Sequence, residues 1–363
     1  MPRIVPIDPA DARWDRYVQA NERARVYHLS AWARILRAAY GYRPAALALE
    51  DDGGLRGLLP LMASRGVVSG RRLRSLPSVP PAGPIGDTPE HEAELMRAAC
   101  ALAEARDAKA LLCLSRGEGY EERVPELAAA PMNPAWVVAL PGDPEELRAA
   151  WRKGSKNLHR SLNKSDKSGV TVREGRSVED LRTFYRLYMG TMKAHHSLPR
   201  GWRQLSEARK QLLDAGVFRV FLADHQGETV AAGIFHSFGH TIDLLYAGSN
   251  PARLDVRPNH ALYWHVIRWG IENGYRHFDF GEAKPGSELE RFKAQWSAEP
   301  VPAWRYDYAL DGSAARADTL RHAGHRMGRA GGASRREELL AKAWDRAPLP
   351  VTRLAGEVVY RFL

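Results

Sequence analysis

The sequence predicts an α/β protein with two domains. Residues 241–247 are rich in β-branched and aromatic side chains and end at a Gly-Ser-Asn-Pro stop, and residues 276–280 form a second short strand. Between them, Leu262, Val266 and Trp269 follow helical spacing. A helix between two strands at this distance predicts a parallel crossover, the basic unit of α/β folds. A length of 363 residues favours two domains.

Composition limits the class of protein. No apolar run reaches the ~18 residues that would span a bilayer, and the first residues lack the pattern of a signal peptide. Cys100 and Cys113 are the only cysteines, so we expect no disulfide framework and a cytoplasmic location. The net charge of +10 points to an anionic partner, such as nucleic acid, a phosphorylated lipid carrier or a membrane surface. The alternative is an ordinary enzyme from an arginine-rich proteome.

The first domain is predicted to cover residues 1–142. Residues 11–40 have the pattern of a helix anchored by Trp14 and Trp32, and residues 51–54 form a hairpin turn. Residues 73–87 are rich in proline and predict an extended loop. The other expected elements are strands at 45–49, 55–63, 110–114 and 136–140 and a helix at 91–106.

A basic helix, residues 143–169, is expected to link the domains. Its cations recur at every fourth residue, which places them on one helix face: Arg148, Arg152, Lys156, Arg160 and Lys164. Like charges at this spacing repel each other, so an anion bound along the stripe would explain it. The alternative is a solvated face that Gly154 interrupts.

The second domain is predicted at residues 170–310. Its other expected elements are strands at 170–172, 217–223 and 229–237 and helices at 178–193 and 202–214. Asn259, after Pro258, is expected to cap the crossover helix, and Asn273-Gly274 to end it. His195 and His196 follow a helix without any metal-binding spacing, so no metal is predicted.

Residues 311–363 are expected to form a helical, amphipathic tail. In its last helix the apolar residues keep helical spacing on one face: Val351, Leu354, Ala355, Val358, Val359 and Phe362. Most such helices pack on their own domain, and a minority lie in a membrane interface.

Several motifs carry a resemblance to a known family. The segments LYAGS (245–249), FDFG (278–281) and RFKAQW (291–296) resemble the FemAB branch of the acyltransferase fold shared with GNAT enzymes, and most closely its exosortase-associated subgroup. The resemblance implies two tandem GNAT-like domains and transfer of an aminoacyl or acyl group to an amine of a peptidoglycan or exopolysaccharide precursor. The basic helix before Lys167, Gly169 and Val170 also resembles this family, although Asn163 and Ser165 depart from its pattern.

The resemblance also suggests site residues, because no nucleophile elbow, P-loop or Rossmann motif is present. Lys293, paired with Phe292, would stabilise an oxyanion or a donor phosphate, and otherwise it is a surface lysine. Asp279 would orient or deprotonate the acceptor amine, or else cap the following turn. The other predicted substrate-binding residues are Tyr246, Ser249, Asn259, His195, His196, Arg152, Lys156 and Arg160.

Donor and partners stay open at this point. No bound cofactor is expected, and the donor would be aminoacyl-tRNA or acyl-CoA. His260 and Leu262 stand where CoA-binding GNAT loops carry glycine, and Pro258 lacks an N–H, which argues against CoA. The partners would be an anionic envelope precursor, tRNA and the inner face of the cytoplasmic membrane. The other class considered is a non-catalytic protein that binds a lipid-linked glycan.

Overall fold

Three β-sheets form the framework of the structure, a computed structural model that describes residues 2–52, 54–66, 70–309, 344 and 347–362. The small sheet of the first half has the order β1 (Arg3–Pro6), β3 (Leu47–Asp51), β4 (Gly54–Leu59), β7 (Ile85–Gly86). The large sheet of the first half has the order β2 (Arg43–Pro44), β5 (Leu61–Gly66), β6 (Gly70–Ser75), β8 (Ala110–Ser115), β17 (Trp304–Ala309), β9 (Ala128–Pro131). The second-half sheet has the order β11 (Thr171–Gly175), β12 (Phe218–His225), β13 (Glu228–Phe238), β14 (Thr241–Ser249), β15 (His277–Glu282), β10 (Ala135–Ala139), β16 (Glu299–Val301).

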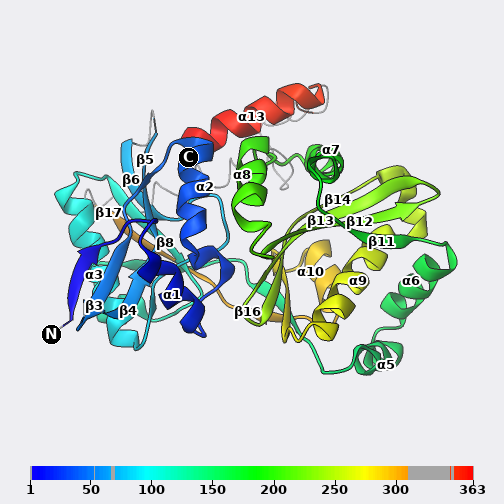
Figure 1. Cartoon of the computed structure of the whole chain (residues 1–363), viewed down its shortest axis with the longest axis horizontal. Coiled ribbons are helices and arrows are strands. Elements are labelled where there is room, and N and C mark those ends of the chain that lie inside the picture. The colour runs from blue at the N-terminus through cyan, green and yellow to red at the C-terminus, as the bar shows by residue number, and fades with distance from the viewer. Residues whose placement is uncertain (1, 53, 67–69, 310–343, 345–346, 363) are drawn as a thin grey trace.

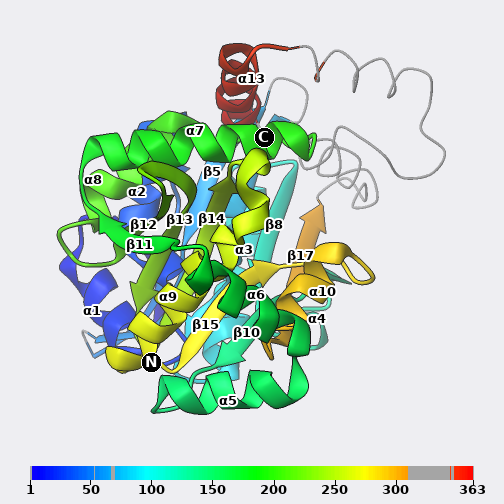
Figure 2. The same cartoon turned by 90° about the vertical axis from the view of Figure 1, so that its right-hand side faces the viewer.

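The helices lie around these sheets (Figures 1 and 2). Those of the first half are α1 (Ala12–Ala20), η1 (Val26–His28), α2 (Ser30–Tyr40), α3 (Pro89–Ala105) and α4 (Tyr120–Arg123). Those of the second half are α5 (Pro144–Gly154), α6 (Lys156–Lys167), α7 (Val178–Ala194), α8 (Trp202–Leu212), η2 (Pro251–Val256), α9 (Pro258–Glu272) and α10 (Glu288–Ala294). Helix α13 (Leu349–Phe362) lies across the top of both halves in Figure 1.

The predicted parallel crossover is confirmed. Strands β14 and β15 pair in parallel, with Asp243 opposite Asp279, and α9 connects them. Asn273 caps the C-terminus of α9, and Gly274 follows with a φ of 78°. The expected N-cap is wrong by two positions, because Arg257 occupies it and Asn259 lies inside the first turn.

Each half receives a strand from beyond its predicted boundary. Strand β10 falls within the predicted first domain, residues 1–142, yet it pairs with β15 and β16 in the second-half sheet. Strand β17 falls within the predicted second domain, residues 170–310, yet it pairs with β8 and β9 in the first half. The ranges 1–142 and 170–310 therefore misplace these two strands. The exchange covers strand edges that would otherwise be open, and it ties the halves together through main-chain hydrogen bonds.

Two predicted helices are each interrupted. Residues 11–40 form α1, η1 and α2, because the Asp15 carboxylate accepts hydrogen bonds from the Ser30 N–H at 2.8 Å and the Ser30 hydroxyl at 2.6 Å and holds a corner. The basic helix divides into α5 and α6 at Ser155. The loop expected at 73–87 also contributes to two strands, β6 and β7.

The hydrophobic core alternates between the two faces of the second-half sheet. Val220 and Leu222 of β12 belong to a cluster with α7 and with α1 and α2 of the first half. Phe221 and Ala223 face the other way, into a cluster with α9. Because successive side chains of a strand point to opposite faces, one face of this sheet joins the halves and the other carries the crossover helix.

Within the described residues, no helix combines the length and the apolar character that crossing a membrane requires. The tail prediction is confirmed for α13, whereas residues 310–343 lie outside the described part of the chain. The apolar stripe of α13 packs only in part. Val351, Leu354 and Val358 are exposed, whereas Ala355 and Val359 pack against the core beside the buried Thr352, Gly356 and Tyr360.

Candidate functional site

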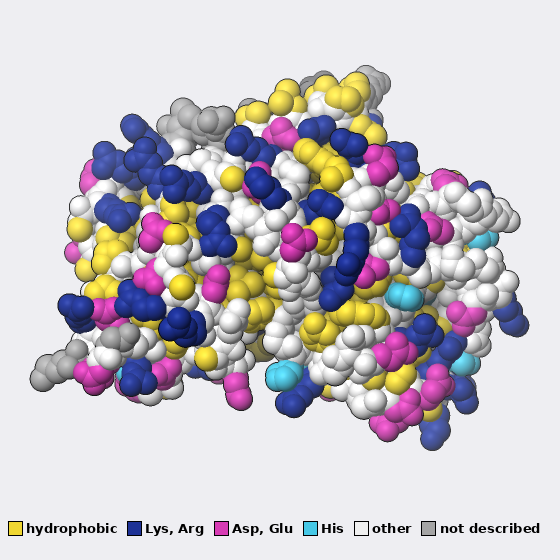
Figure 3. Space-filling view, in the orientation of Figure 1, with side chains coloured by type: hydrophobic (Ala, Val, Ile, Leu, Met, Phe, Trp, Pro, Cys, Tyr) yellow, Lys and Arg dark blue, Asp and Glu magenta, His cyan; other side chains and the backbone are white. Residues whose placement is uncertain are grey.

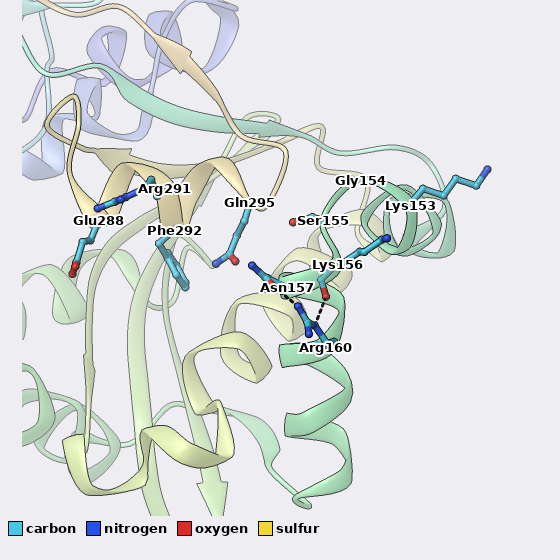
Figure 4. Close-up of a pocket in the computed structure, with 10 residues that line it drawn as sticks. All are labelled: Lys153, Gly154, Ser155, Lys156, Asn157, Arg160, Glu288, Arg291, Phe292 and Gln295. Atoms are coloured by element: carbon cyan, nitrogen blue, oxygen red, sulfur yellow. Dashed lines mark hydrogen bonds between the residues drawn. The ribbon is translucent and has the colours of Figure 1, made fainter.

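A basic cavity of about 700 Å³ opens between α6 and α10 (Figure 4). Lys156 and Arg160 contribute from α6, and Phe292 contributes from α10, so the structure brings three of the predicted site residues together. The other lining residues are Lys153, Gly154, Ser155, Asn157, Glu288, Arg291 and Gln295. Cations, amides and one aromatic ring suit an anionic ligand that carries a planar group, such as a nucleotide.

Local structure explains how the cavity forms. The turn at Gly154 and Ser155 separates α5 from α6, and its residues form part of the wall. The Ser287 hydroxyl caps α10 by accepting the Glu290 N–H at 3.1 Å. The Arg160 guanidinium donates to the Asn157 side chain, and Gln295 extends toward Asn157 from the opposite wall (Figure 4).

Lys293 lies on the buried side of α10, next to the cavity-lining Phe292. Only 3% of it is exposed, so the alternative of a surface lysine is wrong. Its Nζ donates to the main-chain carbonyls of Gly281 at 2.9 Å and Glu282 at 2.8 Å, at the end of β15. Burial lowers the pKa of Lys293 to about 8. The ammonium thus provides a fixed positive charge at the end of β15, and Lys293 does not itself line the cavity.

Asp279 belongs to an ion cluster at the junction of the two halves. Its carboxylate accepts hydrogen bonds from Arg25 at 2.7 Å, Arg116 at 2.5 Å and the Gly281 N–H at 2.7 Å. Arg25 also pairs with Asp243. We call these four side chains, Arg25, Arg116, Asp243 and Asp279, the junction cluster.

The electrostatics of the junction cluster oppose a proton-accepting role for Asp279. Burial opposes ionisation, but Arg116 and Arg25 outweigh it and lower the pKa of Asp279 to about 2. The side chain is 2% exposed and does not line the cavity. Among the described residues the partners of Asp279 are two arginines and the Gly281 N–H, and this last bond agrees with the alternative that Asp279 caps the following turn.

The remaining predicted residues lie outside the basic cavity. The Asn259 side-chain amide donates to the Ser249 hydroxyl at 3.3 Å, so these two residues bind each other. His195 ends α7 and is exposed, and the half-buried His196 follows with a φ of 51°. Arg152 is in the last turn of α5 and does not line the cavity, so the break at Ser155 removes it from the basic stripe.

Tyr246 leads to a residue that the sequence analysis missed. Its hydroxyl accepts a hydrogen bond from Nε of Arg200 at 3.0 Å. The Arg200 guanidinium lies over the Tyr360 ring at 4.1 Å, and its Nη1 is buried without a hydrogen-bond partner among the described residues. No described carboxylate pairs with Arg200 within 4.0 Å. A buried guanidinium without a counter-ion is a candidate anion site. The sequence signal for it was weak, a single arginine after Pro199.

The first turn of α9 shows what stands where a GNAT enzyme would hold CoA phosphates. The His260 ring lies 5.9 Å from Trp296 in a stacked arrangement and 5.5 Å from Phe292. Arg257, the N-cap, makes no side-chain capping bond. The expected glycine loop is thus replaced by packed aromatic rings on the wall that also carries Phe292.

Comparisons with known proteins agree with this architecture. Residues 152–294 match the acetyltransferase (GNAT) domain family. The chain is 27% identical over 115 residues to a UDP-N-acetylmuramoylpentapeptide-lysine N(6)-alanyltransferase of Weissella viridescens, a match that covers 32% of this chain and 34% of that relative. The similar segment therefore spans about one third of the relative's length.

Solved structures extend the likeness to nearly the whole chain. The crystal structure of FemX superposes with a TM-score of 0.70 at 15% identity, covering 86% of this chain and 98% of that one. The structure of L-PGS from Bacillus licheniformis has a TM-score of 0.58 at 13% identity and covers 94% of this chain and 99% of that one. A tandem GNAT protein from the clavulanic acid pathway has a TM-score of 0.50 at 12% identity and covers 85% and 98%.

These matches confirm the FemAB-like resemblance and the tandem GNAT-like α/β fold, whereas the exosortase-associated subgroup stays a prediction. Residues 152–294 match the acetyltransferase (GNAT) domain family, within a chain whose fold is similar to that of FemX.

Proposed function

We propose that this protein is an N-acyltransferase that moves an aminoacyl or acyl group onto an amine of a cell-envelope precursor, belonging to peptidoglycan or to an exopolysaccharide. The observation that carries the proposal is the basic cavity, whose wall contains Phe292 and whose neighbour Lys293 holds a buried positive charge. The similarity to an alanyltransferase that acts on a muramoylpentapeptide supports the same class of reaction.

The basic cavity is proposed to bind the phosphorylated part of the donor. Lys156 and Arg160 line it with no carboxylate bound to either among the described residues, and Phe292 offers a ring for stacking. Aminoacyl-tRNA and acyl-CoA both present phosphates beside a planar base. The first turn of α9 favours aminoacyl-tRNA, because the His260 ring packs there against Phe292 and Trp296 and the N–H groups of His260 and Ala261 already bond to the Arg257 carbonyl instead of being free for CoA phosphates.

In the proposed reaction the neutral acceptor amine attacks the acyl carbonyl of the donor. The new C–N bond forms as the carbonyl oxygen takes up negative charge, and the bond to the donor oxygen or sulfur then breaks. Lys293 supplies the positive charge that stabilises this oxyanion, and the amine loses its proton to solvent. Because Asp279 is held by Arg25 and Arg116, charge stabilisation rather than a carboxylate base carries the rate in this proposal.

A transfer assay with purified protein tests the proposal. Candidate amine-bearing precursors are incubated with aminoacyl-tRNA in one arm and acyl-CoA in the other, and mass spectrometry of the product identifies the donor. We expect Lys293→Met to lower turnover by ~100- to 1000-fold, the usual effect of losing one oxyanion donor. Lys284→Met changes an exposed lysine of the preceding loop and serves as the matched control.

The pH profile separates catalysis from structural support. Because burial lowers the pKa of Lys293 to about 8, the rate of the parent protein should fall above that pH as the ammonium loses its proton. The Lys293→Met protein should lack this descending limb. A variant that turns over at the parent rate would remove Lys293 from the mechanism.

One observation favours a second candidate, a non-catalytic protein that binds a lipid-linked glycan. Lys293 and Asp279, the two predicted catalytic side chains, both have protein partners. Under this alternative, neither donor arm gives a product with any amine-bearing precursor, while the basic cavity still binds the phosphorylated glycan. Precursors from cells with and without the gene, compared by mass spectrometry, would then have identical masses.

The proposal includes a location at the inner face of the cytoplasmic membrane, where lipid-linked precursors are assembled. The exposed apolar stripe of α13 supports peripheral attachment (Figure 3). Sedimentation with anionic vesicles is the direct measurement, and a protein that stays in the supernatant would remove this part of the proposal.

A further inference from the structure

Helix α13 presents two different faces. Val351, Leu354 and Val358 point outward and are 53%, 60% and 47% exposed. In the space-filling view, apolar side chains gather at the top of the molecule, where α13 lies, next to several Lys and Arg side chains (Figure 3). The inward face carries Thr352, Gly356 and Tyr360, all buried. The helix therefore packs through Thr352, Gly356 and Tyr360, with Ala355 and Val359 against the core beside them, and it leaves Val351, Leu354 and Val358 exposed.

The inward face closes the anion site at Arg200. The Tyr360 ring lies 4.1 Å from the guanidinium carbon of Arg200, which has no carboxylate partner among the described residues. An aromatic ring is a weaker partner for a guanidinium than a phosphate or carboxylate, which accepts two parallel hydrogen bonds. Tyr360 is thus a replaceable occupant of this site.

Among the described residues, polar contacts at both ends hold α13 in place. The Tyr360 hydroxyl donates to the Leu198 carbonyl at 3.3 Å, and the Tyr42 hydroxyl donates to the Tyr360 carbonyl. Before the helix, Lys193 donates to the Ala347 carbonyl at 2.8 Å. The main chain at Gly356 approaches Pro199 so closely that a Cβ atom there would lie 2.2 Å from its carbonyl oxygen. Such a close fit allows the helix to be removed by one added methyl group.

We propose that α13 is a lid on the Arg200 anion site and that binding of its apolar stripe to a lipid surface opens the lid. The stripe suits a membrane interface because three apolar side chains at helical spacing lie near Lys and Arg side chains on the same face of the molecule, which attract anionic headgroups (Figure 3). Arg353, within the stripe, is paired with Glu357 at 3.3 Å. Lipid binds the open helix better than the closed one, and this difference shifts the lid toward the open state. The inference goes beyond the proposed function, since it concerns access to an anion site and not the chemistry.

Pyrophosphate binding, measured by calorimetry on the full chain, tests the lid. Gly356→Ala should displace α13 without weakening the helix itself, because alanine has the higher helix propensity. We expect this variant to bind pyrophosphate at least about tenfold more tightly than the parent, as the closed state no longer competes. Gly190→Ala is the matched control, since a Cβ at this glycine of α7 meets nothing within 4 Å.

Two further variants keep the test decisive. Tyr360→Ala removes the ring from Arg200 and should tighten pyrophosphate binding in the same direction, even if Gly356→Ala does not fold. Arg200→Met, added to either variant, should remove the gain. Equal pyrophosphate affinity in the parent, Gly356→Ala and Tyr360→Ala would overturn the lid, whether or not the protein proves to be a transferase.

Vesicles of phosphatidylglycerol test whether a lipid surface opens the lid. They should raise the pyrophosphate affinity of the parent protein toward that of Gly356→Ala, and Leu354→Glu should abolish this effect while leaving the affinity in solution unchanged. A parent protein that never binds the vesicles overturns the lipid signal. A parent that is dimeric in solution, with Leu354→Glu monomeric, also overturns it, because the stripe would then contact a second copy.

Discussion

Three partly buried arginines, Arg25, Arg116 and Arg200, differ in how their charge is balanced. In the junction cluster, Arg25 and Arg116 are matched by Asp243 and Asp279. Arg200 contacts tyrosines only, with Nη1 unpaired among the described residues. In the junction cluster each arginine is already paired with a carboxylate, so the cluster has no free charge for a ligand and its ion pairs connect the two halves. An unbalanced buried cation has such a free charge, so the comparison separates a structural site from a binding site.

The largest expected effect comes from breaking the balance of the junction cluster. Asp279→Ala leaves Arg116 without a carboxylate in a buried position, which should lower the free energy of unfolding by roughly 3–5 kcal/mol. Urea denaturation measures this value. Asp166→Ala is the matched control, because it breaks an exposed ion pair with Arg148 that is worth about 0–1 kcal/mol. Equal losses in the two variants would contradict the structural assignment.

The pH dependence of the free energy of unfolding should reflect the ionisation of Asp279 in the junction cluster. The pKa of Asp279 is about 2 in the folded protein against a usual value of 3.8, so its stabilisation is complete above pH 3.8 and is lost as the pH falls through about 2. The loss should amount to about 2 kcal/mol. Acid denaturation of the parent and Asp279→Asn measures it. The prediction fails if the difference between the two proteins is constant across this range.

The basic cavity contains cations that no carboxylate balances among the described residues, and their role in binding can be tested. Lys156→Glu and Arg160→Glu should each weaken binding of a phosphate-rich probe, such as a short RNA, by roughly 1 kcal/mol or more. Each should also lower the salt dependence of binding, because fewer counterions are released. Arg152→Glu is the control, because Arg152 lies four residues before Lys156 in the sequence but does not line the cavity. If Arg152→Glu weakens binding as much as the other two, a diffuse charge and not the cavity binds the probe.

The smallest expected effect belongs to Arg200. Replacing it by methionine removes a buried charge that no carboxylate balances, so the free energy of unfolding should change by less than about 1 kcal/mol in either direction. Urea denaturation beside Asp279→Ala gives the direct contrast. A loss as large as that of Asp279→Ala would mean that the tyrosines alone make Arg200 a structural residue.

Local sequence patterns determined the elements that depend on near neighbours. The crossover of β14, α9 and β15, the hairpin of β3 and β4 and the helical nature of α13 follow from side-chain periodicity and turn residues. The grouping of Lys156 and Arg160 follows from the spacing of four residues along α6. The FemAB-like motifs added Phe292, which lines the cavity, and Lys293, which bonds to the end of β15.

Tertiary structure alone decided what depends on distant partners. Arg25 and Arg116 reach Asp279 across 254 and 163 residues, so its ion pairing has no trace in the local pattern. The exchange of β10 and β17 requires knowledge of which sheet edges are open. Which residues of α13 pack was likewise set by distant partners, because the main chain at Gly356 approaches Pro199 and Tyr360 covers Arg200. Ala355 and Val359 of the apolar stripe therefore reach the core, and Val351, Leu354 and Val358 do not.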